Sequence, residues 1–111
     1  MKSISKELIG ATSIPIVLSI LKTGDSYGYE IVQRVKKLSD GQVQWNEASI
    51  YPVLKKLESE GMIQSYWKMN EGERPRKYYT ILEKGEKQIE NNKLNLELIY
   101  SLFGKLWGLK T

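Results

Sequence analysis

Hydrophobic residues recur along the chain at two different spacings, and the change of spacing divides it into segments. Up to residue 60 the apolar positions lie three and four residues apart, which is typical of the buried face of an α-helix. This pattern predicts helices over residues 5–22, 27–38 and 47–60. The spacing then changes to two, with aromatic and β-branched side chains, and predicts a hairpin of strands at 63–67 and 77–81.

Two segment ends depend on residues that limit the backbone. Pro15 lacks an amide proton, so the first helix is either kinked there or begins near Thr12 or Ser13. Gly24 is expected to end the first helix. Asp25 or Ser26 is then expected to cap the second helix, because short polar side chains accept hydrogen bonds from free amides.

The third helix has the clearest boundaries. Asn46 is a good N-cap, Glu47 suits the positive end of the helix dipole, and Gly61 stands at the usual C-terminal glycine position. Residues 43–45, just before it, are expected to form a very short strand. Trp45 and Trp67 are interpreted as packing residues at strand edges.

From residue 83 the helical spacing returns and lasts almost to the end. Alternating steps of three and four predict the seam of a two-helix coiled coil. An isolated helix of this length is marginal in water, so the seam predicts a second copy of the chain as partner. The expected dimer interface consists of Ile89, Leu96, Ile99, Phe103 and Leu106.

Composition removes several function classes. The chain has 111 residues, no cysteine and no histidine, which excludes disulfides, Cys/His metal sites and nucleophiles paired with histidine. No pair of carboxylates resembles a catalytic pair, so neither an enzyme nor a bound cofactor or metal is expected. The longest apolar stretch, at 14–21, is too short to cross a bilayer, and a cytoplasmic protein without membrane contact is predicted.

Charge is distributed unevenly around a net value of +4. Basic and acidic residues balance over 22–67, whereas 68–77 carries four positive and two negative side chains. This excess lies at the tip of the predicted hairpin and favours a polyanion as partner.

The order of elements predicts a mainly α fold with a small β-hairpin (α+β), a winged helix-turn-helix with a C-terminal dimerisation helix. Residues 1–82 would form the DNA-binding domain and 83–111 the dimerisation helix. The third helix would enter the major groove of double-stranded DNA while the hairpin holds the neighbouring backbone. The predicted DNA contacts are Ser49, Tyr51, Lys55, Lys56, Arg74, Arg76 and Lys77.

Four ordered motifs carry a resemblance to a known family: YGYEI at 27–31, ASIYPVLKKLE at 48–58, GMI at 61–63 and RPRKYY at 74–79. Together they closely resemble the PadR family of bacterial repressors, over roughly residues 14–85. The ending is similar to the short branch of that family, which has a single C-terminal dimerisation helix.

The resemblance implies a homodimer that binds an inverted-repeat operator, represses a nearby operon and releases DNA when a planar or phenolic ligand binds. Two positions depart from the family pattern. Leu82 stands where a threonine usually caps the last helix. A multidrug-sensing member stacks drugs between tryptophans midway along that helix, whereas this chain has Leu96 there. The candidate ligand-binding residues for a small aromatic or drug-like effector are Tyr100, Phe103 and Trp107.

Each of these predicted sites also has a simpler structural interpretation. Paired lysines are often the solvated face of a core helix, a basic loop tip can serve solubility alone, and the last three aromatics can be an interface stripe. A winged helix that binds protein, or a ligand-binding dimer without a DNA role, is the alternative function.

Overall fold

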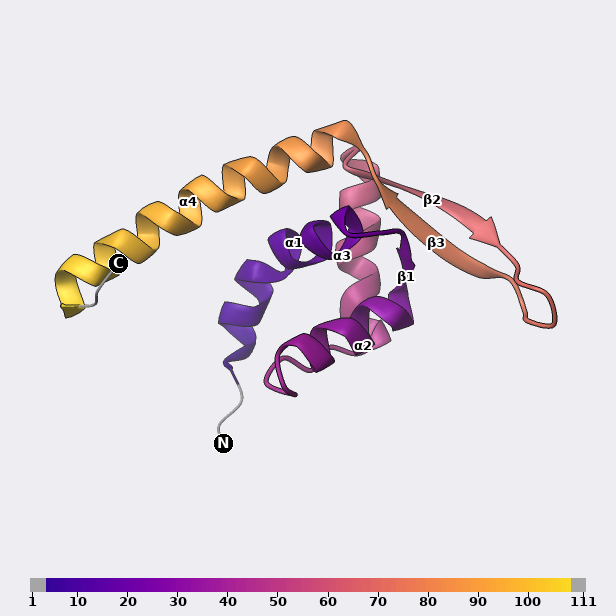
Figure 1. Cartoon of the computed structure of the whole chain (residues 1–111), viewed down its shortest axis with the longest axis horizontal. Helices are drawn as coiled ribbons and strands as arrows, with labels where there is room; N and C mark the ends of the chain where they lie inside the picture. The colour runs from indigo at the N-terminus through magenta and orange to yellow at the C-terminus, as the bar shows by residue number, and fades with distance from the viewer. Residues whose placement is uncertain (1–3, 109–111) are drawn as a thin grey trace.

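A computed structural model describes residues 4–108, and Figure 1 shows their arrangement. Three helices pack with a small antiparallel sheet, and a long fourth helix leaves the body on the side opposite to the projecting hairpin. The predicted α+β fold is confirmed. The elements are α1 (Lys6–Lys22), β1 (Ser26–Tyr27), α2 (Gly28–Leu38), α3 (Glu47–Ser59), β2 (Ile63–Lys68), β3 (Arg76–Ile81) and α4 (Glu83–Trp107).

Helix α1 is capped by Ser5 and continues through Pro15. The Ser5 hydroxyl accepts a hydrogen bond from the amide of Leu8 at 3.3 Å, so the helix starts earlier than Thr12 or Ser13. The hydroxyls of those two residues instead donate to carbonyl oxygens one turn back, at 2.8 and 2.9 Å. The helix tolerates Pro15 in its interior, and Figure 1 shows its axis bending midway.

The short third strand lies elsewhere than predicted. Residues 43–45 form no strand, whereas Ser26 and Tyr27 of β1 pair antiparallel with Tyr79 and Tyr78 of β3. Because Ser26 belongs to a strand, neither it nor the preceding aspartate is the N-cap of α2; that position is Tyr27, without a side-chain cap. The Ser26 hydroxyl donates to the Glu30 carboxylate at 2.5 Å instead.

Helix α3 is fixed at both ends. At its start the side chain of Asn46 and that of Ser49 cap each other's backbone amides, which is a capping box. Past its end Gly61 takes a positive φ of 75°, a conformation that glycine adopts without strain. The Glu58 carboxylate then accepts hydrogen bonds from the amide and hydroxyl of Ser65, at 2.9 and 2.6 Å, which ties β2 to the helix.

The core unites the first helices, the sheet and the first turns of α4. Ile89 is 3% exposed and belongs to this core, and Gly85 lies so close to β2 and β3 that an added Cβ would collide with the Met62 carbonyl oxygen and the Ile81 side chain. The prediction of Ile89 as a dimer contact is therefore corrected, because its own protomer already buries it. The fully buried side chains are Val17, Leu18, Leu21, Ser26, Ile31, Ile50, Leu54, Leu57 and Ile63.

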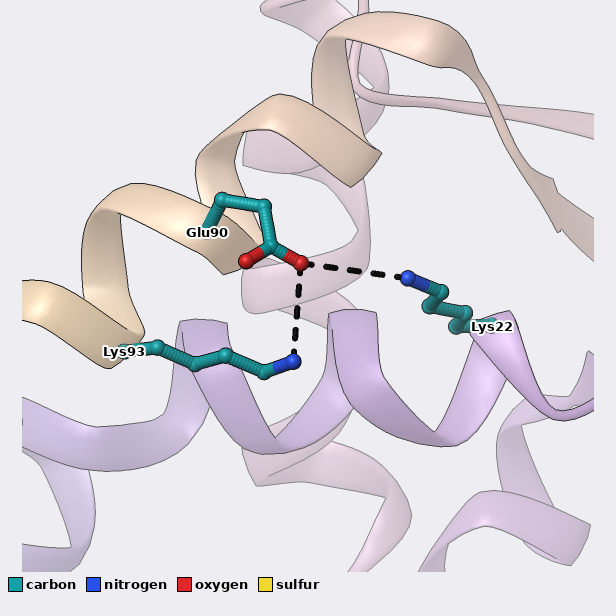
Figure 2. Close-up of polar contacts among 3 residues, drawn as sticks. All are labelled: Lys22, Glu90 and Lys93. Atoms are coloured by element: carbon teal, nitrogen blue, oxygen red, sulfur yellow. Dashed lines mark hydrogen bonds and ion pairs between the residues drawn. The ribbon is translucent and has the colours of Figure 1, made fainter.

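A surface ion-pair cluster also spans α1 and α4. Figure 2 shows the carboxylate of Glu90 between two ammonium groups, 4.0 Å from Lys22 of α1 and 3.5 Å from Lys93 on its own helix. All three side chains are well exposed, so the contribution to stability is small. The direction in which α4 leaves the body is set mainly by the packing of its first turns.

Candidate nucleic-acid interface

The outer surface of α3 is open to solvent along the whole helix. Ala48, Pro52 and Lys55 are exposed, and the helical period places them in the middle of the face opposite the buried side chains. Lys56 is also exposed, on the flank farther from the sheet. The centre of this face has small side chains in its first turns and a lysine further along, so that another surface can approach the helix closely.

Ser49 is exposed, but its hydroxyl is already engaged. It accepts from the Asn46 amide at 3.0 Å and donates to the Asn46 carbonyl oxygen at 2.9 Å. Its own amide is bound by the Asn46 side chain at 2.8 Å. The sequence predicted this residue as a DNA contact, and in the structure its hydroxyl stabilises the start of α3.

Tyr51 is positioned by a glycine on the neighbouring helix. A Cβ added to Gly28 would lie 3.3 Å from two ring carbons and the hydroxyl oxygen of Tyr51, which is closer than ordinary van der Waals contact, so a larger residue would push the tyrosine away. The tyrosine remains 45% exposed. Gly28 therefore lets the ring of Tyr51 rest on the start of α2, facing the sheet.

The outer face of the hairpin carries a chain of aromatic rings. Tyr78 stacks on Tyr66 with a centroid distance of 5.9 Å and meets Tyr27 edge to face at 5.2 Å. The Tyr66 hydroxyl donates to the Asp25 carboxylate at 2.6 Å, which raises the pKa of Tyr66 to about 12. Arg76 extends this row of rings, since its guanidinium carbon lies 4.5 Å from the Tyr27 ring centroid.

The basic side chains of the hairpin differ in freedom. Arg76 is half-buried and its Nε has no hydrogen-bond partner among the described residues, whereas Arg74 in the connecting loop is exposed. The Lys77 ammonium is exposed and lies 5.9 Å from the centroid of the Tyr79 ring. The guanidinium of Arg76 is thus held by its face against Tyr27, and its Nε–H is buried without a partner among the described residues.

A shallow cleft of about 350 Å³ separates α3 from the hairpin. It brings together four of the seven predicted DNA contacts, Tyr51, Arg74, Arg76 and Lys77, while the other three lie along α3 outside it. Its remaining lining residues are Tyr27, Tyr29, Glu47, Trp67 and Pro75.

Trp67 is the lining residue whose interpretation was wrong. It is 69% exposed and therefore is not a packing residue, whereas Trp45 packs half-buried against the core as expected, although no strand forms there. The period of two does place Trp67 on the same face as Ile63 and Ser65. The sequence alone does not show that this strand runs past the end of the core.

Helix α4 exposes apolar side chains on more than one face. Of the predicted seam, Leu96, Ile99 and Leu106 are 46%, 51% and 66% exposed, and Phe103 is half-buried. A second row, which the single-seam pattern missed, follows a neighbouring face with exposures of 54–71%. Its residues are Leu94, Leu98 and Leu102.

The candidate ligand-binding aromatics lie near the far end of α4. Phe103 and Trp107 stack on each other with ring centroids 4.3 Å apart, and Tyr100 one turn earlier is 55% exposed. Nearer the body, an apolar groove of about 710 Å³ runs between α1, the end of α2 and Leu96 of α4. Within residues 4–108 no helix is long and apolar enough to cross a membrane, and no cluster of carboxylates suits a metal ion.

Three packed helices, the third with an exposed face, followed by a hairpin with a basic tip define a winged helix-turn-helix protein. Residues 17–91 match the model of the transcriptional regulator PadR-like family, and the chain belongs to that family. Its members are transcriptional regulators rather than enzymes.

Individual relatives agree with this assignment. YqjI of Escherichia coli, named a transcriptional regulator, is 30% identical over 84 residues, which cover 76% of this chain but only 39% of YqjI. A transcriptional regulator from Clostridium thermocellum superposes with a TM-score of 0.84 at 32% identity, over 92% of this chain and 96% of the other. Bacillus subtilis PadR, solved in complex with operator DNA, gives a TM-score of 0.65 at 26% identity, over 72% of this chain and 45% of that one.

Proposed function

We propose that this chain represses transcription as a homodimer that binds an inverted-repeat operator and releases it when a small aromatic ligand binds. The observation that carries the proposal is the cleft in which Tyr51 of α3 meets Arg74, Arg76 and Lys77 of the hairpin. A helix face open to solvent beside a basic tip suits duplex DNA, because the helix can enter a major groove while the tip neutralises adjacent phosphates. The operator complex of Bacillus subtilis PadR supports this use of the fold.

The residues of the interface divide by role. Ala48 and Pro52 let the start of α3 approach base edges, and Lys55 and Lys56 neutralise phosphates on either side of the groove. Arg74, Arg76 and Lys77 clasp the backbone beyond the major groove. Ser49 acts by keeping the N-terminus of α3 in place, since its hydroxyl is already used in the capping box.

The apolar surface of α4 supports the proposed homodimer. A helix that is apolar on several faces is normally buried, yet in one protomer the outer half of α4 is exposed. A second copy offers two complementary surfaces: its own α4 for the predicted seam, and the groove of about 710 Å³ along α1 for the second row of leucines. Residues 83–111 then serve as the dimerisation element and residues 1–82 as the DNA-binding domain.

The effector site is proposed at the aromatic end of α4. Phe103, Trp107 and Tyr100 present flat rings close to the expected dimer contact, and a planar ligand can stack on such rings. A ligand bound between the two tail helices would change the distance between the two α3 helices and so release the operator.

An anisotropy titration against the upstream intergenic duplex tests the DNA role. We expect tighter binding than to random duplex and a steep loss of affinity with added salt, since each neutralised phosphate releases counterions. Binding equal to random duplex, or insensitive to salt, would overturn the proposal in favour of a protein-binding winged helix. Retained dimerisation with no DNA affinity would favour the ligand-binding dimer.

A further inference from the structure

One large side chain in the cleft between α3 and the hairpin has no structural role within the protomer. Trp67 is 69% exposed, and among residues 4–108 its ring makes no aromatic or cation contact and its Nε1 donates no hydrogen bond. The other aromatic residues of the hairpin have partners within the protomer: Tyr66 and Tyr78 stack on each other, and Tyr79 is only 4% exposed. An exposed indole of this size is a surface that binding can bury.

The position of Trp67 is set by the strand register. Ile63, Ser65 and Trp67 alternate onto one face of β2, and the first two join that face to the core and to α3. Trp67 is the next residue on that face and lies opposite Lys77 of β3. The indole therefore lines the cleft between α3 and the hairpin, together with Tyr51 of α3 and Lys77 of β3.

We infer that Trp67 packs against the sugar–phosphate backbone of the bound duplex, an inference that rests on the proposed function. When α3 lies in a major groove and the hairpin reaches the adjacent groove, the DNA backbone that separates the two grooves must run between α3 and the hairpin. The cleft floor then faces deoxyribose carbons, which suit the apolar ring, and phosphate oxygens, which suit the Nε1–H donor. Trp67 reads no base, so it contributes to affinity on every sequence.

Alanine and phenylalanine at this position test the inference by anisotropy against operator and random duplexes. We expect Trp67→Ala to weaken binding to both about tenfold, and Trp67→Phe to weaken it less, because the ring surface remains. The slope of affinity against salt should be unchanged, since no charge is removed, whereas Lys77→Ala should lower that slope by about one. Met69→Ala is the matched control, because Met69 is 67% exposed on the same hairpin but outside the cleft.

A second measurement reports the contact directly. In protein labelled with 5-fluorotryptophan, the fluorine resonance that disappears in Trp67→Phe should shift when duplex is added. Wild-type affinity of Trp67→Ala, a loss confined to the operator, a changed salt slope, or an unmoved resonance would each overturn the inference while the proposed function stands. If the wild-type chain itself shows no salt-dependent duplex binding, it is the proposed function that fails.

Discussion

The guanidinium of Arg76, at the start of β3, lies over the ring of Tyr27, the last residue of β1, at 4.5 Å from the ring centroid. Tyr27 directly precedes α2, so the contact joins the tip end of the hairpin to the helix-turn-helix. A cation held in this way keeps a fixed direction, which reduces the entropy that it loses on binding an anion. The orientation of the basic tip is thus linked to the position of α2.

Substitutions of Arg76 separate this geometry from charge. Arg76→Lys keeps the charge but loses the planar stack on Tyr27, so we expect several-fold weaker DNA binding with an unchanged salt slope. Arg76→Ala should also lower the salt slope by about one, because one phosphate is no longer neutralised. Anisotropy titrations at several salt concentrations measure both. Lys87→Ala, an exposed cation on α4, should leave binding unchanged.

Gly85 is expected to be indispensable for stability. A Cβ at this position meets the backbone carbonyl of Met62, which cannot move aside as a flexible side chain would. Gly85→Ala should destabilise the protein by about 2 kcal/mol, measured as a lower midpoint of urea unfolding. Gly10→Ala is the control on α1, where an added Cβ meets nothing within 4 Å, and it should stabilise slightly. Equal midpoints for the two variants would contradict the close approach of α4.

Glu58 should make stability depend on pH. The hydrogen bonds from Ser65 lower the pKa of the Glu58 carboxyl below its ordinary value of 4.5. A lowered folded-state pKa contributes stability that is present above pH 4.5 and is lost as the pH falls through the folded pKa. Glu58→Gln should therefore be about 1 kcal/mol less stable than wild type at neutral pH, and the difference should shrink below pH 4.5.

The comparison uses urea unfolding at a series of pH values. Glu71→Gln, at an exposed loop position, is the control and should follow the wild-type pH dependence. A difference between wild type and Glu58→Gln that stays constant down to low pH would show that the carboxylate charge has no part in holding β2.

Leu98 tests the second apolar face of α4. The side chain is 71% exposed in one protomer, so Leu98→Glu should leave the protomer folded but place a charge where the second copy would bury a leucine. We expect the dimer to weaken about a hundredfold and operator binding to fall with it. Sedimentation velocity measures the dimer; an unchanged dimer would limit the interface to the predicted seam. Lys87→Glu, nearer the body on the same helix, is the control.

The sequence predicted the site only in part, for reasons that particular residues show. Arg74, Arg76 and Lys77 were predictable because a local excess of charge at a hairpin tip needs no knowledge of packing. The roles of Ser49 and Trp67 were not, because each depends on what surrounds the side chain. Hydrogen-bond geometry engages the hydroxyl of Ser49, and the length of β2 beyond the core exposes Trp67.

Hydrophobic period, caps and glycines act over a few residues, so the order and type of the main elements could be predicted from them. The first three helices and the two hairpin strands begin and end within one residue of their predicted bounds, and α4 begins at Glu83 as predicted. Tertiary structure decided what depends on distant partners. Ser26 became a strand residue because β3 lies beside it, and Ile89 became core because α4 packs on α1. The cleft forms where tertiary contacts bring distant segments together: Tyr51 of α3 lies beside Gly28 of α2, and Tyr78 of the hairpin meets Tyr27.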